Sequence, residues 1–292
     1  MNNGAMKDCS EMNAGKKDAV DKNIVFVHVP YALLGEHLDF ILNRRINPEI
    51  AFSGDSLDTL DWGRLKDSAA ILSENGIRTT MHAPFMDLSP GALDRLVREA
   101  TRRRFRQAMD AAEILRPSVV VFHPGYDRWR FGGNRDRWLR YSVETFREVV
   151  ERAVGIGCVV AVENIFEEEP STLLDLLETI DSPLFRHCFD VGHWNLFSKL
   201  GMEEWFMELG GHIAEAHIHD NHGTDDNHHP LGEAGIDFPL FFRLMERYAP
   251  EAAWTIEAHS REAVQRALKN IAPFVEQRCS GSEPKGPPQL FP

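Results

Sequence analysis

Histidine and acidic residues recur along this chain at the ends of short apolar segments. They are His82, His123, Glu163, Asp190, His217, His219 and Glu257. Imidazole and carboxylate groups together suit Zn²⁺, and Mn²⁺ or Fe²⁺ are possible alternatives for such a ligand set. Carboxylates that are buried together repel one another unless cations neutralise them. The set therefore predicts a divalent-metal centre, provided that the fold brings these residues to one place.

Neighbouring segments supply further candidate ligands, and each residue also has a simpler interpretation. The further candidates are His193, Asp226 and His228. One histidine at a strand end more commonly makes a structural hydrogen bond, Glu163 alone would suit a salt bridge, and Asp190 would suit a helix cap. These interpretations fail jointly, because they leave several carboxylates without a compensating charge in one cavity.

The apolar segments alternate with longer amphipathic segments. Strands are expected at 24–29, 49–52, 78–82, 119–123, 159–163, 187–190, 214–219 and 254–258. Helical periodicity lies at 61–75, 91–115, 136–155, 172–179, 238–248 and 261–276. Eight strand–helix units predict a single (β/α)8 TIM barrel, in which all strand carboxyl ends meet at one mouth. A doubly wound open sheet is the alternative, but no glycine-rich nucleotide-binding motif follows any strand.

Composition agrees with one globular domain that has polar ends. The 292 residues carry a formal net charge of −13, which disfavours non-specific nucleic-acid binding. The segment from Arg95 to Arg152 differs, since it holds 14 arginines and no lysine against eight acidic residues. We expect a barrel over 24–277, with a disordered polar tail over 1–23 and a disordered Pro- and Gly-rich tail over 278–292.

Cysteine usage and apolar content lead us to expect a cytoplasmic protein. The four cysteines are scattered and form no CxxC pair, so we expect reduced thiols. Residues 1–23 lack the apolar core of a secretion signal. No segment approaches the roughly 20 apolar residues that span a bilayer, so we expect no membrane contact.

Short motifs follow one another in an order that resembles the xylose isomerase-like barrel superfamily. They are HAPF (82–85), FHPG (122–125), VEN (162–164), FDVGH (189–193), HIHDN (217–221), DNHHPLGEAGIDF (226–238) and TIEAH (255–259). The resemblance covers about Ile24 to Val275. This superfamily includes endonuclease IV, also called AP endonuclease family 2, and the sugar phosphate isomerases and epimerases.

The resemblance implies a set of metal ligands. Endonuclease IV uses nine ligands for three zinc ions, and each has a counterpart in this chain. The implied groups are His82, His123 and Glu163; Glu163, shared with Asp190, His217 and Glu257; and His193, Asp226 and His228. Single-metal sugar epimerases of the superfamily need four ligands, which match the second group.

Two enzymatic functions follow from this resemblance. With two or three Zn²⁺ the site would hydrolyse a phosphoester, and we favour this function because a one-metal epimerase has no ligand role for the other five residues. Glu257, and as second choice Glu163, would orient or deprotonate the attacking water. In the alternative, an isomerase or epimerase of sugars or sugar phosphates, the same two glutamates would exchange a carbon-bound proton. A metal-bound binding module without turnover is the third function considered, and the intact acid/base set disfavours it.

Candidate substrate contacts are Arg128, Arg130, Phe85 and His219. Arginine forks bind phosphate well, and an aromatic ring at the mouth can face a sugar or a base. We expect a small phosphorylated or carbohydrate-like substrate. DNA is possible but not favoured, because residues 51–63, which match the DNA-gripping loop of endonuclease IV, are acidic here. The oligomeric state stays open.

Overall fold

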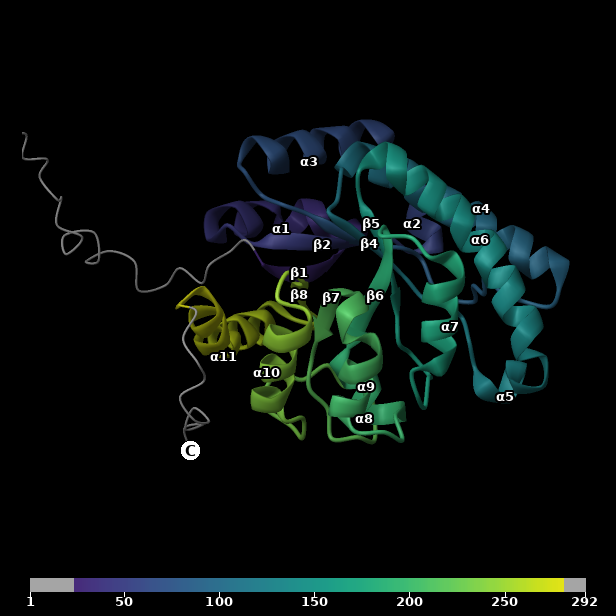
Figure 1. Cartoon of the computed structure of the whole chain (residues 1–292). Coiled ribbons are helices and arrows are strands. Elements are labelled where there is room, and N and C mark those ends of the chain that lie inside the picture. Colours follow the sequence, from purple (N-terminus) through teal and green to yellow (C-terminus); the bar gives the residue numbers. More distant parts are fainter. Residues whose placement is uncertain (1–23, 281–292) are drawn as a thin grey trace, which may run out of the picture.

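The computed structural model describes residues 24–280, which form a closed barrel of eight parallel strands surrounded by helices (Figure 1). The strands are β1 (Val25–Pro30), β2 (Asn47–Ala51), β3 (Thr80–His82), β4 (Val119–Phe122), β5 (Val159–Glu163), β6 (Phe185–Asp190), β7 (Ile213–Ile218) and β8 (Ala253–Ile256). They follow one another around the barrel in sequence order, and β8 closes against β1. The predicted single (β/α)8 barrel is confirmed, and the open sheet is excluded.

The helices cover the outside of the barrel. They are α1 (Tyr31–Arg44), α2 (Gly54–Asp58), α3 (Trp62–Glu74), α4 (Arg95–Leu115), α5 (Arg128–Phe131), α6 (Arg135–Ile156), α7 (Ser171–Ile180), α8 (Val191–Phe197), α9 (Met202–Leu209), α10 (Phe238–Tyr248) and α11 (Arg261–Ser280). Each helix predicted from periodicity is present. The pattern misses α1 and the short helices α2, α5, α8 and α9. In α1, Leu34 and Ile41 are the only two buried side chains, and polar residues interrupt the apolar face between them.

Two apolar layers show which strand residues face inward. Val120, Phe122 and Val160 belong to the large core between the strands and the helices. Val121 and Ala161 belong instead to a small cluster inside the barrel. Since successive side chains of a strand point to opposite faces, residues two positions beyond the second pair also face inward. The ligand candidates that follow β4 and end β5 are therefore aimed into the barrel mouth.

The ends of the described residues can be compared with the expected domain boundaries. Helix α11 continues to Ser280, beyond the boundary expected at residue 277. The expected tail over 1–23, and the part of the C-terminal tail beyond 280, lie outside the described residues. Within the described part, no helix is both long enough and apolar enough to cross a membrane.

Candidate metal centre and active site

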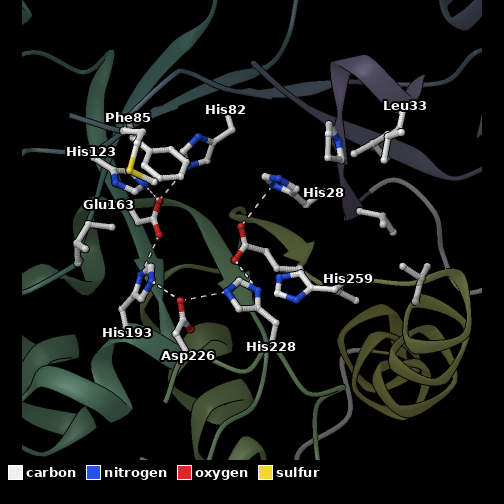
Figure 2. Close-up of a pocket in the computed structure, with 18 of the residues that line it drawn as sticks. His28, Leu33, His82, Phe85, His123, Glu163, His193, Asp226, His228 and His259 are labelled. Carbon is white, nitrogen blue, oxygen red and sulfur yellow. Dashed lines mark hydrogen bonds and ion pairs between the residues drawn. The ribbon is translucent and has the colours of Figure 1, made fainter. Parts of the chain in front are cut away.

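A cavity of about 910 Å³ lies at the carboxyl ends of the strands. Its lining includes seven of the nine predicted ligands: His82, His123, Glu163, His193, Asp226, His228 and Glu257. In Figure 2 the labelled members of this set point from different elements toward a common centre. The other two, Asp190 and His217, are fully buried next to them. The cavity therefore has the position that active sites occupy in this architecture.

Glu163, the last residue of β5, is the centre of the first ligand group. Its Oε2 lies 3.2 Å from His82 Nε2 and 3.2 Å from His123 Nε2. Its Oε1 lies 3.1 Å from His193 Nδ1 and 3.5 Å from His217 Nδ1. Ligand atoms at about 2.0–2.1 Å from a tetrahedral zinc ion are roughly 3.3 Å apart, so these spacings suit a shared ion. We call His82, His123 and Glu163 the Glu163 group.

The second group surrounds His217 on β7. His217 Nδ1 lies 3.4 Å from Glu257 Oε1 and 3.9 Å from Asp190 Oδ2, in addition to its approach to Glu163. One imidazole nitrogen thus faces three carboxylates. We call these four residues the His217 group, and they correspond to the ligand set expected for a single-metal site.

Asp226 joins the third group, which comes from helix α8 and the loop after β7. Its Oδ2 lies 3.2 Å from His228 Nε2 and 3.5 Å from His193 Nε2 (Figure 2). We call Asp226, His193 and His228 the Asp226 group. The fold thus brings the nine predicted ligands close together. Groups of ligand atoms within 4.8 Å of one another include His82, His123 and Glu163, but they also place His219 with Asp190 and His193, and with Asp226 and His228.

Buried nitrogens without hydrogen bonds test whether this set suits metal ions. Within the described residues, Nδ1 of His217, of His219 and of His228 has no hydrogen-bond partner. A buried polar atom without a partner costs free energy, so such atoms are rare unless another group satisfies them. Lone pairs on imidazole nitrogens beside carboxylates are the donors that divalent transition metals prefer. The residues therefore fit a metal cluster.

A family model described as xylose isomerase-like TIM barrel matches residues 49–275. The chain belongs to this family. An uncharacterized protein of Methanocaldococcus jannaschii is 30% identical over 217 residues, which cover 71% of this chain and 74% of that protein.

Solved structures of related barrels resemble this one over most of its length. A D-tagatose 3-epimerase-like protein has a TM-score of 0.76 and 26% identity, and the match covers 88% of this chain and 99% of that one. A Thermus thermophilus protein soaked with ZnCl2 has a TM-score of 0.74 and 22% identity, with 89% and 99% covered. At 22% identity, the similarity to the second structure is evidence for the fold alone.

Asp190 both caps a helix and belongs to the His217 group. Its Oδ1 accepts hydrogen bonds from His193 N at 2.7 Å and from His219 Nε2 at 3.1 Å. Its Oδ2 remains directed at His193 Nδ1, 3.3 Å away. Gly192 makes this arrangement possible, because a Cβ there would collide with the ring of His219. The FDVGH motif therefore combines a capping residue, a ligand candidate and space for a second imidazole.

Sequence reasoning missed two polar residues beneath the cluster. Glu49 on β2 is fully buried, and its Oε2 lies 3.2 Å from His217 Nε2. Its Oε1 lies 2.9 Å from His28 Nδ1, which in turn lies 3.4 Å from Glu257 Oε1. When a carboxylate accepts a hydrogen bond from one ring nitrogen of a metal-binding histidine, it fixes the tautomer so that the other nitrogen has a free lone pair for the metal. Glu49 acts in this way on His217, through Nε2, and leaves Nδ1 for the metal. The only sequence signal was an acidic residue inside an apolar strand.

Replacing Glu49 with glutamine is expected to weaken zinc binding about 10- to 100-fold, the usual effect of losing such a carboxylate partner. Burial opposes the charge of Glu49, but the charge of His217 and the hydrogen bonds with His217 and His28 outweigh it and lower the pKa well below its ordinary value. The variant removes that charge while keeping the shape. Competition with a fluorescent zinc chelator would measure the dissociation constant, and a value within twofold of the wild type would contradict this role.

The pKa values of the cluster describe its metal-free charge state. Burial raises the pKa of Glu163, but the charges of His217 and His123 outweigh burial and hold the pKa well below its ordinary value. The same competition, here with His217 and His28, lowers the pKa of Glu257 to about 2. Burial lowers the pKa of His217, yet the surrounding carboxylates raise it well above its ordinary value. Metal ions must displace these imidazolium protons, so binding tightens as the pH rises.

Glu167 is a buried carboxyl group just outside the cluster. Burial raises its pKa to about 7, although the backbone N–H of Ile165 donates a hydrogen bond to its Oε2 at 2.7 Å and lowers it in part. Since the folded pKa exceeds the unfolded one, the stabilising contribution is complete below about pH 4.5 and is lost as the pH rises through 7.

In metal-free protein, we therefore expect Glu167 to lower the free energy of unfolding by on the order of 3 kcal/mol between about pH 4.5 and 7.5. The Glu167→Gln variant, which carries no titrating group there, should lack this decrease. Urea unfolding of both proteins across that range measures the difference. If the free energy of unfolding of the two proteins changed with pH in parallel, the pKa of Glu167 would not be raised in the folded state.

The four candidate substrate contacts occupy different positions. Phe85 lines the cavity, stacks on the His123 ring with a centroid distance of 4.2 Å, and is 41% exposed. Arg130 also lines the cavity. Arg128 instead forms an ion pair with Glu168 at 2.9 Å and is not part of the lining. His219 is fully buried among the ligands and is not part of the lining. Its contact with Asp190 and its place in two groups that could hold a metal ion support a role in the metal centre rather than contact with substrate.

The arginine-rich segment does not surround the mouth. Half of its 14 arginines form ion pairs with acidic side chains, in contacts such as Arg104 with Asp58, Arg135 with Asp175, and Arg102 with Glu148. Of the arginines between 95 and 152, a segment that the structure describes throughout, Arg130 alone lines the cavity. The arginine-rich segment therefore contributes one guanidinium to the cavity.

Proposed function

We propose that this chain is a divalent-metal-dependent enzyme that binds two or three Zn²⁺ and hydrolyses a phosphoester in a small phosphorylated or carbohydrate-like substrate. The observation that carries the proposal is the shared position of Glu163, whose two oxygens face two different ligand groups. The Asp226 group lies beside them and has no ligand role in a one-metal enzyme. Mn²⁺ and Fe²⁺ would suit the same ligand types.

When bound, the ions would supply water activation and charge neutralisation on the phosphoester oxygens. Glu257 lines the cavity and is ionised at neutral pH because its pKa is about 2, so it can accept a hydrogen bond from the attacking water and orient it. Glu163 is the second candidate for this role. Phe85 presents a ring face for an apolar side of the substrate, and Arg130 presents a guanidinium for a phosphate.

The shape of the site favours a small substrate over DNA. The ligands line one cavity of about 910 Å³, which is within the range of small-molecule sites. The acidic stretch at residues 51–63 and the small number of arginines in the lining, Arg130 and Arg261, offer little attraction to a DNA backbone. We therefore propose a small molecule as the substrate.

Zinc-loaded protein is expected to hold two or three equivalents of metal and to hydrolyse p-nitrophenyl phosphate or bis(p-nitrophenyl) phosphate. Elemental analysis and release of p-nitrophenol measure the two quantities, and chelation should abolish the second. One equivalent of metal with no hydrolysis of either ester would reject the hydrolase.

A second candidate function, epimerisation or isomerisation of a sugar or sugar phosphate, is favoured by a different observation. Glu163 Oε1 and Glu257 Oε1 lie 3.5 and 3.4 Å from the same nitrogen of His217, so two carboxylates face one ligand position. The similarity to a D-tagatose 3-epimerase-like protein supports this candidate as well. Deuterium from solvent appearing at a sugar carbon would establish it for that sugar.

A further inference from the structure

One end of the cavity extends away from the metal ligands, and the proposed reaction makes no use of it. This annex is enclosed by the end of β1, by α1 and by the first turn of α11, and its lining includes Pro30, Leu33, Phe40, Ile41, Ile46 and Val264. Figure 2 shows Leu33 on the opposite side of the ligand cluster from Phe85 and His123. The cavity thus has a polar centre between Phe85 at one end and an apolar annex at the other.

The polar side chains around the annex already have partners. Arg261 Nη2 donates to His37 Nδ1 at 2.7 Å, and the guanidinium lies 5.6 Å from the centroid of the Phe40 ring. Ser260 Oγ accepts a hydrogen bond from Ala263 N at 3.1 Å. The Arg261 contacts join α1 to α11, and the remaining surface that faces the annex is mainly hydrocarbon.

A mainly hydrocarbon surface favours binding of apolar groups over polar ones. A hydroxyl or phosphate placed against Leu33, Phe40, Ile41 and Val264 would give up hydrogen bonds to water that these side chains cannot replace, whereas a hydrocarbon group would gain from leaving water. The cavity volume of about 910 Å³ is near the upper end of the range of roughly 300–1,000 Å³ for drug-sized ligands. A monosaccharide held at the ligand cluster is much smaller than that and leaves the annex unfilled.

We propose that the substrate carries an apolar substituent, an alkyl chain or an aromatic ring, which the annex binds while the polar part of the molecule reaches the metal ligands. The placement of the polar part rests on the proposed metal-dependent function. The affinity of the annex for a hydrocarbon group rests on its own lining and does not require the metal.

Aliphatic hydroxamates test the proposal in the zinc-loaded protein, because their head group chelates zinc and their chain length can be varied. Octanohydroxamate is expected to bind at least tenfold more tightly than acetohydroxamate, since each fully buried methylene contributes up to about fourfold. Isothermal titration calorimetry measures both dissociation constants. Equal affinities for the two compounds would overturn the proposal.

Leucine variants locate the binding site of the alkyl chain. Leu33 is 42% exposed, so Leu33→Asp should fold, and it should reduce the gain from chain length to less than threefold. Leu96→Asp is the matched control, because Leu96 is 65% exposed on α4 and does not line the cavity. The proposal would be overturned if Leu33→Asp kept the full increase in affinity from acetohydroxamate to octanohydroxamate. It would also be overturned if Phe85→Ala lost that increase instead, because the alkyl chain would then bind elsewhere in the cavity.

A metal-free measurement separates this proposal from the proposed function. If acetohydroxamate does not bind the zinc-loaded protein, the metal-dependent function fails. The fluorescence of 8-anilinonaphthalene-1-sulfonate still reports on the annex. Wild type and Leu96→Asp are expected to bind this probe with similar affinity, and Leu33→Asp at least tenfold more weakly. Equal binding to all three proteins would overturn the annex itself.

Discussion

When Glu163 is replaced by glutamine, we expect zinc content to fall to one equivalent or less and phosphoester hydrolysis to fall by about 10³-fold or more. Glu163 reaches His82 and His123 through one oxygen and His193 and His217 through the other, at distances of 3.1 to 3.5 Å. Glutamine keeps one oxygen that can bind a metal ion, but its NH2 group cannot replace the second carboxylate oxygen, and the side chain carries no charge. Elemental analysis and kcat/KM for the hydrolysed ester measure the two effects.

Glu167→Gln is the matched control for this variant. Glu167 is also buried and lies four residues further along, but its carboxylate accepts a hydrogen bond from the backbone of Ile165 instead of facing histidines. The control should keep its metal and most of its activity. Two or three equivalents of zinc in Glu163→Gln would show that Glu163 is not the shared ligand.

Replacing Asp226 with alanine is expected to separate the two candidate functions. Asp226 joins His193 and His228 and is 42% exposed at its side chain, so the fold should tolerate the change. A hydrolase that uses the Asp226 group should lose about one zinc equivalent and on the order of 10²-fold or more in kcat. An epimerase that uses only the His217 group should keep its metal and its activity.

Asp225→Ala provides the comparison for Asp226→Ala. Asp225 is the exposed neighbour in the same loop and does not line the cavity. It should behave as the wild type in metal content, thermal unfolding and rate. An identical loss of activity in both variants would point to a disturbed loop and would remove the support for a third metal-binding group.

The barrel was predictable because several strands are short apolar runs that are buried on both faces. The runs VVVF in β4 and VVAVE in β5 have this character, and longer amphipathic segments separate them from their neighbours. Helix α1 was not predicted because its apolar side chains are divided between the core and the cavity annex. They therefore do not form the continuous apolar stripe from which a helix is recognised in the sequence.

The predicted ligands met because parallel strands of a barrel end at the same mouth. His123 follows β4, Glu163 ends β5 and Asp190 ends β6, so their positions in the sequence were enough to expect their convergence. Glu49 and His28 gave no comparable signal. Barrel closure places the inward face of β2 across from β7, and that closure gives Glu49 its contact with His217.

The alternation of strands and helices was therefore sufficient to predict the barrel, and candidate ligands at strand ends were sufficient to expect that they converge, because a strand's direction and its period of two are local properties. The environment of each side chain needed the folded structure. Arg128 faces Glu168, His219 contacts Asp190, and Leu33 lines an apolar annex. Burial and pairing of this kind depend on segments that are far apart in the chain, and no local pattern encodes which of them will meet.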